Sequence, residues 1–195
     1  MVKKILFFFF FININNYCFA EQKFEIIAVV NNISITRLDL SKEIKIIEIL
    51  NNKINLTNQE NIALKNIIDE KIKTIEIEKE KMKIDENSIN NSYKILLNNL
   101  NLESSNLDES IENLIKEKIK IDRLWNELIK KKFSWKVNIN IDELNKKILQ
   151  EKTNVAKIEK IKEKIILEEK NKKILVYSNF YLNELRSKTL IKYLK

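Results

Sequence analysis

The chain has 195 residues, of which 44% are hydrophobic and 33% are charged. That apolar fraction is too high for a disordered tail, and the length suits one ordinary domain, with or without a small appendage. The sequence contains no Gly, Pro or His, which excludes Ser-His-Asp and Cys-His catalytic sites and glycine-rich phosphate loops. The formal net charge is +8, but Lys alternates with Glu along nearly the whole chain and no basic stripe with interleaved aromatic residues occurs. We therefore expect no nucleic-acid partner.

The first 20 residues have the pattern of a secretory signal peptide. Lys3 and Lys4 form a positive start, the run Ile5–Ile12 is apolar throughout, and Cys18–Ala20 has small residues at both ends of a cleavage triplet. The apolar run is far shorter than the ~20 residues that cross a bilayer, so a signal peptide is favoured over a permanent membrane anchor. We expect cleavage after Ala20 and export to the periplasm, which leaves a mature chain without cysteine.

A β-hairpin and a helix are predicted next. Residues 24–30 are β-branched and apolar, Asn31 and Asn32 can adopt positive φ, and residues 33–36 alternate between apolar and polar. Thr36 or Asp39 can cap the following helix. That helix has apolar residues at helical spacing on one face, namely Leu40, Ile44, Ile47 and Leu50.

A long helix is predicted to begin at Thr57, which has capping-box spacing with Glu60. Its apolar stripe ends in the charged segment Glu78–Lys81, which we expect to be solvated. The stripe comprises Leu64, Ile67, Ile68, Ile72 and Ile75.

Asp85 or Asn87 is expected to start the next helix, and Asn106 with Glu109 resembles a further capping pair. The helix after Asn106 is expected to be the longest. The apolar faces of these two helices comprise Ile89, Tyr93, Leu96, Leu97 and Leu100 in the first, and Ile111, Leu114, Ile115, Leu124, Trp125, Leu128 and Ile129 in the second.

The remainder of the chain is predicted to be helical with a strand at its end. Residues 137–141 are briefly extended, Asp142 can cap a helix through Leu149, and residues 154–186 have a helical pattern. Residues 189–194 have strand character.

The segment Ala28–Leu40 resembles the opening of the SurA-type periplasmic chaperones. In that family a "VVN…IT..DL" hairpin-to-helix start precedes a helix with an "LIDEKL" core, which is matched here by Ile67–Ile72. Residues 179–186 followed by 190–194 are similar to the closing helix and strand of the family. The resemblance covers nearly all of the chain after residue 20, but the parvulin-type prolyl isomerase domains of the family have no counterpart in it. We therefore expect no isomerase activity.

The resemblance implies a mostly α fold, a helical chaperone module whose short N-terminal β-hairpin pairs with a C-terminal strand. It divides the chain into a signal peptide (1–20), a chaperone domain (21–150), and a C-terminal helix and strand that pack back on the same module (151–195). It implies a periplasmic, ATP-independent holding chaperone that binds unfolded polypeptides, outer-membrane β-barrel proteins above all, without stable membrane insertion. The alternative is a helical scaffold or subunit of the cell envelope with one dedicated protein partner.

Trp125, Phe133 and Trp135 are the candidate client-binding residues. An aromatic cluster at a helix end beside an extended link can form the lip of a groove, but each ring can equally close the core. Lys130–Lys132 beside them fit a solvated last helical turn. We expect no catalytic residue, cofactor or metal site, because the mature chain has neither His nor Cys and its carboxylate pairs, such as Glu78 with Glu80, stand among lysines.

Overall fold

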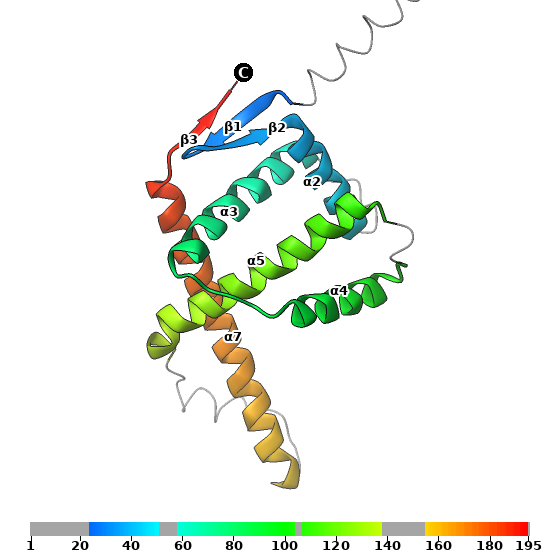
Figure 1. Ribbon diagram of the computed structural model, residues 1–195. Helices are drawn as coiled ribbons and strands as arrows, with labels where there is room; N and C mark the ends of the chain where they lie inside the picture. Colours follow the sequence, from blue (N-terminus) through cyan, green and yellow to red (C-terminus); the bar gives the residue numbers. More distant parts are fainter. Residues whose placement is uncertain (1–23, 51–57, 104–106, 138–154, 195) are drawn as a thin grey trace, which may run out of the picture.

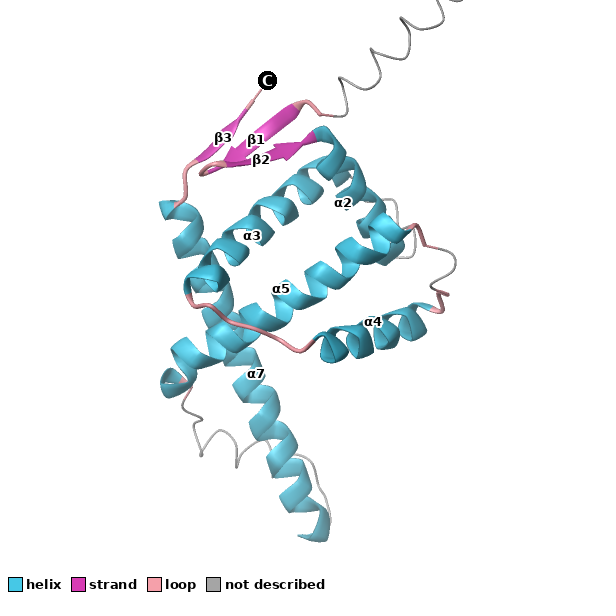
Figure 2. Ribbon diagram, viewed as in Figure 1, coloured by secondary structure: helices cyan, strands magenta, loops and turns pink. Residues whose placement is uncertain are grey.

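The computed structural model describes residues 24–50, 58–103, 107–137 and 155–194. The predicted signal peptide, the residues Thr57 and Asn106, the predicted helix at 142–149 and nearly all of the predicted extended link before it lie outside these ranges. The described elements in chain order are β1 (Ile26–Val30), β2 (Ile33–Thr36), α2 (Arg37–Leu50), α3 (Gln59–Lys79), α4 (Glu86–Leu100), α5 (Glu109–Phe133), the 3-10 turn η2 (Ser134–Lys136), α7 (Val155–Lys188) and β3 (Ile191–Tyr193). Figures 1 and 2 show the mostly helical body with one small sheet at its end, as predicted.

The sheet is antiparallel and joins the two ends of the described chain. Its strand order is β2-β1-β3, so the N-terminal hairpin pairs with the C-terminal strand, which confirms the predicted fold class. Asn31 occupies the hairpin turn with φ of 52°, a conformation that Asn tolerates better than most residues. The sheet packs on α2 and α3 through the fully buried side chains of Ala28, Val30 and Ile35.

The starts of the helices agree with the sequence only in part. Thr36 and Asp39 form a reciprocal cap, in which the Asp39 backbone N–H donates to Thr36 Oγ1 at 3.2 Å and the Thr36 N–H donates to Asp39 Oδ2 at 2.9 Å. Asp85 accepts from the Ser88 N–H and caps α4, also as predicted. The helix α5 is capped by Asp108, two residues beyond the predicted Asn106.

Two expectations about helix ends and lengths are wrong. The N-cap position of α3 is Asn58, in the left-handed region with no side-chain cap hydrogen bond, one residue later than the predicted Thr57. The predicted capping box depends on Thr57 and therefore lies outside the described residues. The longest described helix is α7 with 34 residues, whereas α5 has 25. The helical pattern predicted over residues 154–186 nearly matches α7, so only the ranking of the two helices by length was wrong.

Three clusters of buried apolar side chains hold the helices together. The first lies between the sheet, α2 and α3, and the second lies between the C-terminal half of α5, α3 and α7. The third joins α2, α4 and the N-terminal half of α5. Leu182 and Leu185 of α7 contact both of the first two clusters. The last turns of α7 therefore connect the sheet end of the molecule to α5, while the first part of α7 projects away from the other helices (Figure 1).

Candidate functional site

The predicted aromatic residues lie where the C-terminal part of α5 crosses α7. Trp125 is only 2% exposed, its indole N–H donates to Ser178 Oγ at 2.8 Å, and its ring stacks on Tyr181 with 5.8 Å between centroids. Phe133 is half-buried, with its centroid 5.3 Å from Tyr177 and 5.6 Å from Tyr181. Two positions were predicted for Trp125, at the lip of a groove or in the core. The structure places it in the core, so Trp125 is no longer a candidate client-binding residue.

Trp135 remains available at the surface. It belongs to η2, directly after α5, and 71% of it is exposed. Its indole N–H donates to the backbone carbonyl of Lys132 at 3.0 Å, and the ammonium of Lys136 lies 4.8 Å from its ring centroid. These two contacts hold the indole in one orientation, with the half-buried Phe133 near it on the chain. The ring is thus an ordered apolar surface next to lysines, which suits weak contact with another chain.

A buried carboxylate ties α3 to α5 and α7 beneath this cluster. Glu76 is 6% exposed, accepts a hydrogen bond from the Tyr181 hydroxyl, and lies 3.3 Å from Lys132 Nζ and 3.1 Å from Lys79 Nζ. Burial alone raises the pKa of Glu76, but the hydrogen bonds from Tyr181, Lys79 and Lys132 outweigh burial and lower it.

The two partners of Glu76 on α5 and α7 are held in their usual protonation states. Burial lowers the pKa of Lys132, but its contacts with Tyr181, Glu76 and Glu80 outweigh burial and raise it. Burial, followed by the hydrogen bond to Glu76, raises the pKa of Tyr181. A lysine that keeps its proton and a carboxylate that stays ionised are poorly suited to acid–base catalysis at neutral pH. The contacts among Glu76, Lys132 and Tyr181 hold α3, α5 and α7 together.

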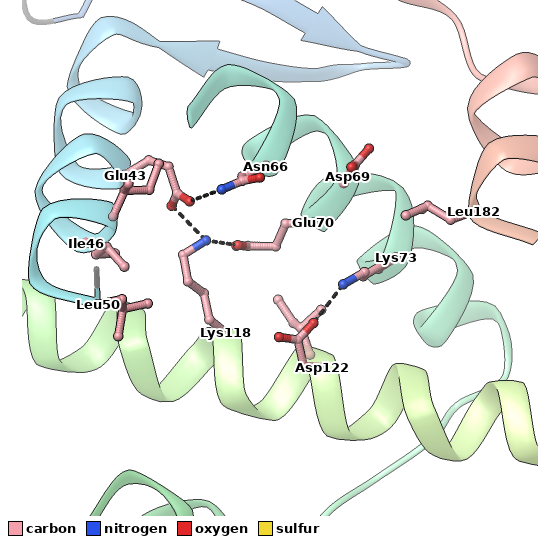
Figure 3. Close-up of a pocket in the computed structure, with 12 residues that line it drawn as sticks. Glu43, Ile46, Leu50, Asn66, Asp69, Glu70, Lys73, Lys118, Asp122 and Leu182 are labelled. Carbon is pink, nitrogen blue, oxygen red and sulfur yellow. Dashed lines mark hydrogen bonds and ion pairs between the residues drawn. The ribbon is translucent and has the colours of Figure 1, made fainter. Parts of the chain in front are cut away.

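A polar cavity of about 370 Å³ opens between α2, α3 and α5 (Figure 3). Lys118 of α5 lies at its centre, 2.7 Å from Glu43 and in direct contact with Glu70, and Glu43 also accepts from the Asn66 amide at 3.2 Å. Burial lowers the pKa of Lys118, but Glu70 and Glu43 outweigh burial and raise it. The other charged lining residues pair as well: Lys73 with Asp122 at 2.7 Å, and Asp69 with Arg186.

Within the described residues, the cavity therefore contains no unpaired acid or base that could carry out a reaction, and its charges fix the packing of three helices. No group of three or more His, Cys, Asp and Glu side chains among the described residues is arranged to hold a metal ion.

Three apolar side chains of α7 are largely exposed. Leu175, Val176 and Phe180 are each more than three-fifths exposed, within two turns of one helix. Trp135 of η2 is exposed as well. The sequence contains one indication of this exposure, because this part of α7 has more apolar residues than one buried stripe needs. The stripe that packs on the core consists of Ile174, Tyr177, Tyr181 and Leu185. The three residues above lie outside it.

No known protein family has a model that matches this chain, and no curated protein matches it. Among the helices that the structure describes, none combines the length and the apolar character needed to pass through a bilayer.

Proposed function

We propose that this protein is a periplasmic holding chaperone of the SurA type, which binds unfolded polypeptides without ATP and keeps them from aggregating. The clients that the proposal favours are outer-membrane β-barrel proteins. The observation that carries it is the exposure of Leu175, Val176 and Phe180 on the otherwise Lys- and Glu-rich helix α7. Val176 and Phe180 are four residues apart and therefore neighbours on the helix surface, so one client segment can cover both.

The size of this surface fits weak and reversible binding. Fully burying an exposed large apolar side chain contributes about 1.5–3 kcal/mol, so the exposed three-fifths of these three residues of α7 supply roughly 3–6 kcal/mol. Association and the ordering of a flexible client cost on the order of 4–15 kcal/mol. A client must therefore bury further surface, such as Trp135, to reach micromolar affinity, which corresponds to about 8 kcal/mol. Clients that expose many apolar residues, as unfolded chains do, meet this condition.

The export of the protein to the periplasm is supported by the pattern of residues 1–20. Membership of the family is supported by the resemblance of Ala28–Leu40 and Ile67–Ile72 to the SurA-type pattern. A dedicated scaffold of the cell envelope would use the same surface for one folded partner. The range of clients separates the two classes, because a chaperone binds unrelated unfolded chains and a scaffold does not.

The experiment compares light scattering by a denatured outer-membrane β-barrel protein, diluted into buffer without nucleotide, in the presence of wild-type protein or variants. The double variant Val176→Ser/Phe180→Ser is expected to require several-fold more protein for half-maximal suppression. Asn171→Ser/Asn179→Ser, on neighbouring turns of α7 and at exposed positions, is the matched control and is expected to act as wild type. Equal suppression by both double variants would contradict a role for this face.

A further inference from the structure

The outer edge of the sheet at β3 has free backbone groups. β3 pairs with β1 on one side and is the last strand in the order β2-β1-β3. The residues that flank it, Leu190 and Leu194, are hydrogen-bonded to the segment around β1 at 2.8 and 2.9 Å. In an antiparallel ladder this spacing turns the backbone of Lys192 toward β1, and turns the N–H and C=O groups of Ile191 and Tyr193 outward. No described residue supplies a hydrogen-bond partner to these outward groups.

A hollow of about 390 Å³ lies directly beside this edge. One wall is β3, where the side chains of Ile191 and Tyr193 share a face with their buried cross-strand partners Val30 and Ala28. The other wall is α3, and Arg186 of α7 stands at one end (Figure 1 shows the three elements around this place). The residues that α3 contributes are Asn61, Leu64, Lys65 and Ile68. The hollow has the volume of an ordinary binding pocket, and its centre is apolar.

The unpaired backbone groups of β3 and the apolar residues of the hollow together favour an extended polypeptide as the ligand. A free strand edge is satisfied by another extended backbone, which donates and accepts at alternate residues. The side chains of such a strand alternate between its two faces, so every second one would enter the hollow over Leu64 and Ile68 while the others face solvent.

A second copy of this chain is the less suitable occupant. In the twofold register that pairs both outward residues of one β3 with those of its copy, Lys192 lies opposite its own copy, at the closer of the two cross-strand spacings. Like charges directly opposite each other destabilise a strand pair. A client segment with apolar or uncharged residues at that position meets no such repulsion.

We propose that β3 is the docking edge for an extended, apolar client segment, which joins the sheet as a fourth strand and places alternate side chains in the hollow between β3 and α3. This inference rests on the proposed function and specifies one mode of client contact. It differs from the contact on α7 in kind, because the backbone of the client supplies the hydrogen bonds and only every second side chain is bound. Such a mode accepts many sequences, as a holding chaperone must.

The probe is a fluorescein-labelled nine-residue peptide in which valine or phenylalanine alternates with threonine, titrated with the protein and followed by fluorescence anisotropy. Two further peptides have methyl groups on every second backbone nitrogen, one in each of the two alternations. One methylated peptide is expected to bind at least tenfold more weakly than the parent, because its methyl groups face β3. The other is expected to bind as the parent does. Equal affinity of all three peptides would overturn the inference.

The matching protein variants are Tyr193→Pro and Tyr193→Ala. Proline removes the outward N–H at this position without removing a bond to β1, and proline is tolerated on edge strands in that orientation. Alanine keeps the N–H and removes the ring. We expect Tyr193→Pro to bind the parent peptide at least tenfold more weakly than Tyr193→Ala, with both variants folded by circular dichroism. The methylated peptides test the inference on the wild-type protein even if Tyr193→Pro fails to fold.

Sedimentation velocity tests whether a second copy of this chain binds at β3 instead. A dimer of the wild-type protein that Tyr193→Pro abolishes, without binding of the peptide, would overturn the inference in favour of a second copy. Failure of this inference is distinct from failure of the proposed function. If the wild-type protein suppresses aggregation but binds no peptide at β3, the docking edge is refuted and the chaperone proposal stands; if it suppresses no aggregation, the chaperone proposal itself is refuted.

Discussion

Replacing Lys118 by Met removes the cation that joins α2, α3 and α5. Lys118 lies between the carboxylates of Glu43 and Glu70, and Glu43 is only 5% exposed (Figure 3). Methionine has a similar length and no charge, so the substitution fills most of the same space. It leaves two carboxylates near each other on different helices, and one of them is buried without a compensating charge.

The expected loss follows from this burial. Removing one partner of a buried ion pair costs about 3–5 kcal/mol. The side chain of Lys118 is 20% exposed, so water can reach part of the site and the lower end of the range, about 3 kcal/mol, applies. For a chain of this length each kcal/mol lowers Tm by about 2–4 °C, which gives a decrease of roughly 6–12 °C for Lys118→Met.

The measurement is urea unfolding followed by the helical circular dichroism signal at pH 7. The matched control is Lys120→Met, two residues further along α5, because Lys120 pairs with Glu117 at 3.3 Å and both side chains are about half exposed. That substitution is expected to cost less than about 1 kcal/mol. The triple variant Lys118→Met/Glu43→Gln/Glu70→Gln should recover most of the loss. Equal losses for Lys118→Met and Lys120→Met would refute the reasoning.

Three further predictions concern stability. Trp125→Phe leaves the buried Ser178 hydroxyl without its donor and should cost about 1–3 kcal/mol in urea unfolding, whereas a change below about 0.5 kcal/mol would show that the bond is immaterial. Thr36→Ala removes the side-chain oxygen that caps α2 and should cost about 1 kcal/mol, with no change in the slope of the urea transition. The raised pKa values of Lys132 and Tyr181 mean that the folded state binds their protons more tightly, so their contribution is fully present below about pH 10 and is lost as the pH rises further. Urea midpoints should therefore be level from pH 7 to about 9.5 and fall above about pH 10, and Tyr181→Phe should flatten that fall; a decline that begins below about pH 9 would contradict this assignment.

The sequence predicted the elements whose determinants are close together in the chain. The hairpin followed from Asn31 between two β-branched segments, and the start of α2 followed from Thr36 and Asp39, which cap each other over three residues. The apolar stripe of α3 was also correct at Ile67 and Ile68, which are buried against the sheet. In each case the pattern and the contact lie within a few residues, so periodicity and capping are sufficient.

The sequence could not predict features that depend on residues far apart in the chain. Glu76 lies just before the charged segment Glu78–Lys81, and nothing near it in the chain indicates that its carboxylate is buried. It accepts a hydrogen bond there from Tyr181, 105 residues later. The core position of Trp125 depends in the same way on Ser178, 53 residues later. The edge at β3 and the hollow beside it exist only after β1, α3 and α7 have come together. Such sites leave no local pattern in a single sequence.

A holding chaperone is distinguished by its binding of unfolded chains of unrelated sequence. The most direct measurement is light scattering during dilution of two denatured proteins, an outer-membrane β-barrel protein and an unrelated soluble enzyme, with increasing amounts of the purified wild-type protein and no nucleotide. Aggregation of both is expected to be suppressed at near-stoichiometric amounts. Suppression of neither, together with tight binding of one folded partner from the cell envelope, would contradict the chaperone proposal and identify a dedicated scaffold instead.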